Sequence, residues 1–193
     1  MKSLFLILGL AIIGSLIYIG YYKKGMDNPP TTTNNPTALI RTNKGDMLIE
    51  LFADKTPITV KNFITLSEKS FYDETLFHRV IANFMIQGGD PNTRSGESRT
   101  FGMGGPGYTI LDEFVPGLSN VTGTISMANS GSNTGGSQFF INVVDNTYLD
   151  NKHTVFGKVL TGMDVVLKIS KIQVDANDLP IDPIRIDTIF IKK

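Results

Sequence analysis

The chain contains no cysteine among its 193 residues, and this absence removes several chemistries at once. It excludes disulfide bonds, thiolate zinc sites, cysteine nucleophiles and anchoring through a lipidated cysteine. The formal net charge is zero, so the broad electrostatic surface that nucleic acid would require is missing. The only two histidines, His78 and His153, are too far apart in the sequence for metal-ligand spacing. We therefore expect no metal, no cofactor and no nucleic-acid partner.

Two common catalytic motifs are also missing. The glycine-rich stretches "FGMGGPGY" at 101–108 and "SGSNTGGSQFF" at 130–140 both lack the Gly-Lys-Ser/Thr ending of a phosphate-binding loop. We interpret both stretches as turns. No Gly-x-Ser-x-Gly elbow occurs, which argues against an ordinary serine hydrolase.

One long hydrophobic run is present, at the N-terminus. From Leu4 to Tyr22 there are 19 residues without a charge, about the length needed to cross the hydrocarbon core of a bilayer. The run ends in two tyrosines and two lysines, which are typical of a membrane interface rather than of a cleavage site. We predict an uncleaved transmembrane helix within residues 1–25, with a cleaved signal peptide as the alternative.

The rest of the chain divides into a linker and one domain. Residues 26–37 are rich in Pro, Thr and Asn, which is typical of a semi-rigid linker, and a domain follows at 38–193. Residues 38–52 predict a β-hairpin that turns at 43–46. Residues 56–70 predict a helix with Thr56 as N-cap and Pro57 at its first position. A second helix is expected near Met163, and alternating residues at 184–193 predict a final strand.

Short apolar runs separated by glycines occupy the middle of the domain. The chain holds 19 glycines and 9 prolines that are spread rather than clustered. Many short strands with two isolated helices favour a mainly β fold, an antiparallel barrel with helical caps.

Three blocks in this domain resemble a known family. They are "FYDETLFHRVIANFMIQGGDP" at 71–91, "GTISMANSGSNTGGSQFFI" at 123–141 and "YLDNKHTVFGKVLTGMDVV" at 148–166. Their motifs and their order closely resemble the cyclophilin-type peptidyl-prolyl cis-trans isomerases. The resemblance extends over essentially the whole chain from Ala38 onward.

The resemblance implies a fold and a site. The fold would be cyclophilin-like, a closed eight-stranded antiparallel barrel capped by two α-helices, with substrate on its outer face. The implied catalytic residues are Arg79, Phe84, Gln87, Phe140 and His153. The implied substrate-binding residues are Met85, Ala128, Asn129, Gln138 and Leu149.

The chemistry of prolyl isomerisation suits these residue types. Rotation about the bond breaks amide resonance, with a barrier near 18–20 kcal/mol, and makes the proline nitrogen a better hydrogen-bond acceptor. A permanently charged donor such as Arg79 therefore gains strength only as the bond twists. The reaction needs no general base, so we interpret His78 as a structural residue.

Two positions depart from the family pattern. Ala82-Asn83 stands where the family commonly has Pro-Gly or Pro-Asp, and we expect the turn to form because Asn tolerates the left-handed conformation. Tyr148 stands where many eukaryotic members have a tryptophan associated with binding of cyclosporin. We therefore expect weak cyclosporin binding at most.

The expected function is isomerisation of Xaa-Pro bonds in unfolded or partly folded proteins by a monomeric enzyme. The alternative is a membrane-tethered proline-peptide binding module, or holdase chaperone, with little turnover. Retention of Arg79 favours the enzyme, because a pure binder would not need the donor. The anchor and linker predict a single-pass protein of the cell membrane with its catalytic domain outside the cytoplasm. The flanking lysines leave the opposite orientation open.

Overall fold

The structure is a computed structural model that describes residues 35–95 and 97–193. These residues form one compact unit from Asn35 to Lys193. The predicted membrane anchor and residues 26–34 of the predicted linker lie outside the described residues. Within the described part, no helix is both long enough and apolar enough to cross a membrane.

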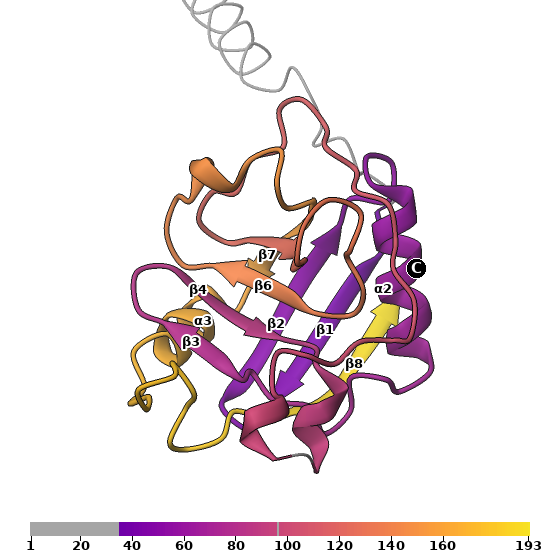
Figure 1. Cartoon of the computed structure of the whole chain (residues 1–193). Helices are drawn as coiled ribbons and strands as arrows, with labels where there is room; N and C mark the ends of the chain where they lie inside the picture. Colours follow the sequence, from indigo (N-terminus) through magenta and orange to yellow (C-terminus); the bar gives the residue numbers. More distant parts are fainter. Residues whose placement is uncertain (1–34, 96) are drawn as a thin grey trace, which may run out of the picture. The chain divides into compact units, whose positions relative to one another are not determined.

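Eight antiparallel strands form one curled sheet (Figure 1). Their order in the sheet is β3-β4-β6-β5-β7-β2-β1-β8, and neighbouring strands are hydrogen-bonded. The mainly β architecture expected from the sequence is confirmed. The strand bounds are β1 Thr37–Thr42, β2 Gly45–Leu51, β3 Arg79–Ile81, β4 Met85–Gly88, β5 Thr124–Met127, β6 Phe139–Asn142, β7 Val155–Thr161 and β8 Ile186–Lys192.

The expectation of a closed barrel is wrong in one respect, because no ladder joins the two edge strands β3 and β8 in the described sheet. The edges are instead joined by a few backbone hydrogen bonds just before these strands, such as Phe77 N to Ile184 O at 2.8 Å. The segment leading into β8 carries Pro180 and Pro183, which have no N–H to donate to a ladder. The sheet is therefore a curled half-barrel.

The predicted hairpin is confirmed. Strands β1 and β2 pair from Thr37 opposite Glu50 to Thr42 opposite Gly45, and a two-residue turn joins them. Gly45 has a φ of 134°, and a side chain there would meet Val165 at 2.8 Å. A glycine is therefore required on both conformational and steric grounds.

Two α-helices cover the sheet, as the sequence predicts. Helix α2 spans Pro57–Glu68 and packs against β8, and helix α3 spans Met163–Ile169 and packs against β2 (Figure 1). The predicted capping by Thr56 is wrong, because its side chain makes no cap and instead donates to Phe52 O. The carboxylate of Glu113 accepts from Ile58 N at 3.0 Å and Thr59 N at 2.8 Å. Short 3-10 helices lie at Pro91–Arg94, Ser98–Thr100 and Thr147–Leu149.

The core lies inside the curl of the sheet. Aromatic rings dominate it, and the rings of Phe63 and Phe139 meet edge to face at 5.5 Å between centroids. The two-residue period of a strand directs Phe139 into this core and the next residue, Phe140, to the outer face. The same alternation on β4 directs Ile86 inward and Met85 outward. The outer face of β3, β4 and β6 therefore carries the residues that form the site.

Candidate active site

Strand register aligns the central residues of the site in one row. Arg79 of β3 is paired with Gln87 of β4, Gln87 with Phe140 of β6, and Phe140 with Ser126 of β5. Paired residues on neighbouring strands point to the same face of the sheet. The fold thus brings Arg79, Gln87 and Phe140 together although they are up to 61 positions apart in the sequence.

This row opens into a cavity of about 300 Å³ on the outer face. Nine of the ten site residues predicted from the sequence line it, and the tenth, Gln138, lines the neighbouring cavity. The lining residues are Arg79, Phe84, Met85, Gln87, Ala128, Asn129, Phe140, Leu149 and His153.

The cavity has an apolar base. Phe140 and Met85 are buried, with 4% and 2% of their surface exposed. The ring of His153 meets Phe140 edge to face, with centroids 5.3 Å apart. Phe84 stacks on Tyr148 at 6.2 Å, and the 3-10 helix that carries Tyr148 also supplies Leu149. Such a base excludes water and suits a small saturated ring.

A backbone carbonyl of strand β5 fixes the orientation of the His153 ring. Its Nδ1 lies 3.1 Å from Met127 O. A carbonyl oxygen only accepts hydrogen bonds, so Nδ1 carries a proton and donates it to this contact. His153 therefore serves as a wall whose ring plane is held by strand β5.

Arg79 supplies the cationic group. Its side chain is 44% exposed, and its Nε lies 3.6 Å from Oδ2 of Asp178, a partner that the sequence did not predict. Because the ion pair uses Nε, the terminal Nη groups are available to a ligand in the cavity. The guanidinium keeps its charge at any physiological pH.

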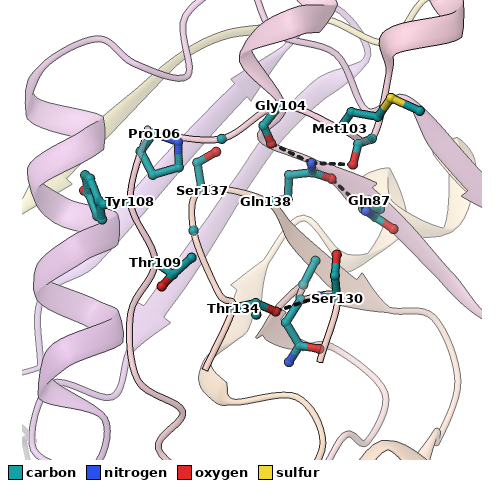
Figure 2. Close-up of a pocket in the computed structure, with 15 residues that line it drawn as sticks. Gln87, Met103, Gly104, Pro106, Tyr108, Thr109, Ser130, Thr134, Ser137 and Gln138 are labelled. Atoms are coloured by element: carbon teal, nitrogen blue, oxygen red, sulfur yellow. Dashed lines mark hydrogen bonds between the residues drawn. The ribbon is translucent and has the colours of Figure 1, made fainter. Parts of the chain in front are cut away.

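A second cavity of about 370 Å³ adjoins the first, and Gln87, Ala128 and Asn129 line both (Figure 2). Gln87 Nε2 donates to Gln138 Oε1 at 2.9 Å. Gln138 Nε2 in turn donates to the carbonyls of Gly102 and Gly104, at 2.9 and 2.8 Å (Figure 2). This chain of hydrogen bonds connects the outer face of β4 with the glycine-rich loop at 102–107.

Asp90 holds that loop in place. The Asp90 side chain is fully buried. Its Oδ2 accepts hydrogen bonds from Gly102 N at 2.5 Å and from Gly104 N at 3.2 Å. Its Oδ1 accepts a hydrogen bond from Asn92 N at 2.8 Å. A Cβ on Gly104 would overlap the same carboxylate. The stretch 101–108, expected from the sequence to be only a turn, therefore also forms a wall of the second cavity.

The turn between β3 and β4 forms as predicted. Asn83 adopts a φ of 57°, in the left-handed region that Asn tolerates. Phe84 O then accepts from Val143 N at 2.9 Å and from Asn146 Nδ2 at 3.0 Å. These bonds hold Phe84 at the edge of the first cavity without the proline common in the family pattern.

His78 lies next to Arg79 in the sequence but does not line the cavity. It is 5% exposed, and neither ring nitrogen has a hydrogen-bond partner among the described residues. Burial lowers the pKa of His78 below its ordinary value of 6.5, and the nearby charge of Asp90 partly opposes this shift. A neutral imidazole is therefore favoured at this position.

No group of three or more His, Asp or Glu residues that could hold a metal ion occurs in 35–95 or 97–193. The site consists instead of one cation, an apolar base and neutral hydrogen-bonding groups. Such a set can bind an apolar ring and direct a charged donor at an atom beside it.

Comparison with known proteins identifies the relatives of this chain. The family model described as cyclophilin type peptidyl-prolyl cis-trans isomerase/CLD matches residues 37–190. Peptidyl-prolyl cis-trans isomerase cypE of Dictyostelium discoideum is 47% identical over 153 residues, which cover 78% of this chain and 94% of cypE. Peptidyl-prolyl cis-trans isomerase A of Mycobacterium tuberculosis is 42% identical over 83% of this chain and 97% of its own length.

Isomerase CYP71 of Arabidopsis thaliana is 44% identical, but the match spans only 26% of its length. A crystal structure of a Cryptosporidium parvum cyclophilin-type isomerase, determined in the presence of the dipeptide Ala-Pro, superposes with a TM-score of 0.75 at 36% identity. That match covers 81% of this chain and 99% of the other.

Proposed function

The chain belongs to the family of cyclophilin-type peptidyl-prolyl cis-trans isomerases, and on this basis we propose that Arg79 stabilises the twisted amide while the cavity beside it holds the proline ring. The substrates are Xaa-Pro bonds in unfolded or partly folded proteins. The observation that carries the proposal is the position of a half-exposed guanidinium in the wall of a cavity whose base is apolar.

The role proposed for each residue of the site follows from the nature of the reaction. Rotation makes and breaks no bond to a partner, so the enzyme needs only to bind the twisted state more tightly than the planar one. Phe140 and Met85 hold the ring, and the carbonyl before the proline turns against Arg79 and Gln87. In the planar amide the nitrogen lone pair is delocalised into the carbonyl, whereas in the twisted state it is localised on the nitrogen, and the guanidinium donates to it.

The energies set the share of each group. A 10⁵-fold acceleration requires roughly 7 kcal/mol, at about 1.4 kcal/mol for each factor of ten. One hydrogen bond from a charged donor supplies about 1.5–3 kcal/mol of this. The remainder must come from orientation of the bound segment, which is the role of the cavity walls and of Asn129, whose side chain is itself held by Lys152 O at 2.7 Å.

The cellular setting is a separate part of the proposal. A membrane anchor at 1–25 and the linker between it and the domain would display the isomerase domain at the cell membrane, outside the cytoplasm, where newly exported chains fold. The uncharged run from Leu4 to Tyr22 supports this. Protease accessibility of the domain in intact cells tests it, and a domain protected until the cells are opened would reverse the orientation.

The function is tested by exchange NMR on a short peptide with one Ala-Pro bond, with the full-length chain in a mild nonionic detergent. We expect strong acceleration by the wild type. Phe140→Ala should lose roughly tenfold or more in kcat/KM, because the ring loses its buried partner. Phe190→Ala is the matched control, since Phe190 lies on β8, 51% exposed and outside both cavities, and should retain wild-type activity.

The same samples separate the enzyme from a holdase. Binding of the peptide without acceleration in the wild type would refute the isomerase and support a binding module with little turnover. Acceleration that Phe140→Ala leaves intact would refute the assignment of the cavity.

A further inference from the structure

A tight loop at 175–179 lies beside Arg79. Oδ1 of Asp175 accepts from Asn177 N at 2.8 Å and Leu179 N at 3.0 Å, and Asp175 N donates to Leu179 O at 2.9 Å. Asp178 within this loop adopts a φ of 63°, which is uncommon for a residue with a side chain. The loop is thus closed on itself and presents Asp178 in a defined conformation.

Asp178 makes two contacts with strand β3. Its backbone oxygen accepts from Val80 N at 2.9 Å, and its carboxylate lies 3.6 Å from Arg79 Nε. The backbone hydrogen bond fixes the loop to β3 at Val80. Because Arg79 is the neighbouring residue of this strand, the Asp178 carboxylate is brought close to its guanidinium. No other ion pair or hydrogen bond of the Arg79 side chain is found in the described part of the chain.

The Arg79 side chain borders two spaces, the proline cavity and a second groove. Besides the proline cavity, Arg79 lines a groove of about 650 Å³ whose walls include Asp175, Arg99 and Asn177. Side chains of arginine have several rotatable bonds, so an unrestrained guanidinium would divide its time between the two spaces. The Asp175 carboxylate in the groove is an alternative anionic partner.

We propose that Asp178 is a positioning residue that holds the guanidinium of Arg79 toward the proline cavity through its contact with Nε. The proposal rests on the proposed function, because it assigns a role to Asp178 through Arg79. It does not make Asp178 a catalytic residue, since its contact is with Arg79 Nε and it does not line the proline cavity. Engagement of Nε leaves the Nη groups for the substrate.

The test is Asp178→Asn in the full-length chain in mild detergent. Asparagine retains the size of the side chain and tolerates the left-handed backbone, so the bond to Val80 should survive. Asp182→Asn is the matched control, because it removes the same charge from the same segment but its partner is Lys44. We expect Asp178→Asn to lower kcat about two- to fivefold, or about 0.4–1 kcal/mol, with KM nearly unchanged. The control should match the wild type.

Two further readouts distinguish positioning from a merely structural role. In an Arg79→Ala background, Asp178→Asn should have no further effect, because the partner is gone. In ¹⁵N NMR the Arg79 Nε–H group should become more mobile in Asp178→Asn and remain unchanged in Asp182→Asn. This second readout does not depend on activity.

The outcomes are separable from those of the proposed function. An inactive wild type with an ordered Arg79 Nε–H that is freed by Asp178→Asn refutes the isomerase but supports the contact. An unchanged Nε–H signal overturns the positioning role. So does a loss of kcat that is equally large in the wild-type and Arg79→Ala backgrounds. Restoration of kcat by Asp178→Glu would support it further.

Discussion

Replacement of Asp90 by asparagine should destabilise the domain and loosen the wall of the second cavity. The substitution preserves the shape of the side chain but replaces one carboxylate oxygen with an NH₂ group. Three backbone N–H groups converge on this carboxylate, from Asn92, Gly102 and Gly104. Whichever way the amide turns, its NH₂ faces at least one of these donors.

The size of the effect follows from the contacts. In the better orientation the amide loses the bond from Asn92 N, at about 1.5–3 kcal/mol for a hydrogen bond to a charged acceptor. The other two bonds weaken from charged to neutral, at about 1 kcal/mol each. The sum is about 3.5–5 kcal/mol. For a domain of this size, each kcal/mol lowers the midpoint of thermal unfolding by about 2–4 °C, so Tm should fall by roughly 7–20 °C.

Circular dichroism is a suitable assay, because the chain has no tryptophan to report unfolding by fluorescence. Asp145→Asn is the control, since Asp145 also accepts a backbone N–H, from Thr122 at 2.8 Å, but in an exposed turn. Its Tm should stay close to that of the wild type. A Tm of Asp90→Asn within about 2 °C of the wild type would show that the hydrogen bonds to the Asp90 carboxylate do not stabilise the domain as proposed. In the folded mutant KM should rise more than kcat falls, because Gln138 loses its fixed acceptors.

Three further predictions concern pH, capping and inhibition. Burial lowers the pKa of His78 in the folded protein, so as the pH falls the unfolded chain binds a proton at this residue before the folded chain does. The free energy of unfolding should therefore be full above about pH 6.5 and fall below it by at most about 1.4 kcal/mol per pH unit, and His78→Gln should remove this slope in urea unfolding. Glu113→Gln should lower the free energy of unfolding by about 1–2 kcal/mol, because helix α2 loses a charged cap, and an unchanged urea midpoint would contradict this. Tyr148→Trp should strengthen inhibition by cyclosporin in the isomerisation assay, whereas equal inhibition of both proteins would show that this position does not set sensitivity.

Local patterns in the sequence predicted the elements that depend on local physics. The turn at 43–46 and helix α2, with Pro57 at its first position, are both encoded within a few neighbouring residues. Asn83 in the left-handed region belongs to the same class. The gathering of nine predicted residues around one cavity required the family resemblance, because strand order is not visible in any single stretch.

Contacts between distant segments were missed for a physical reason. Thr56 has the right type and position for an N-cap, but Glu113, which follows 57 positions later, takes the free N–H groups of the helix. Asp178 lies 99 positions after Arg79, in a stretch that carries no motif. The absence of a closing ladder depends in turn on two prolines before β8. Each of these features becomes visible only when the backbone brings the segments together.

The most direct test of the account measures Arg79→Ala with the peptide fully bound. Exchange NMR at saturating enzyme gives the rate of cis–trans interconversion on the enzyme, and titration gives Kd. The bound rate should fall about 10- to 150-fold, through the loss of one charge-assisted hydrogen bond, while Kd changes little because the bond forms only in the twisted state. A bound rate equal to that of the wild type would refute the stabilisation of the twisted amide by Arg79, as would a loss of binding with the bound rate unchanged.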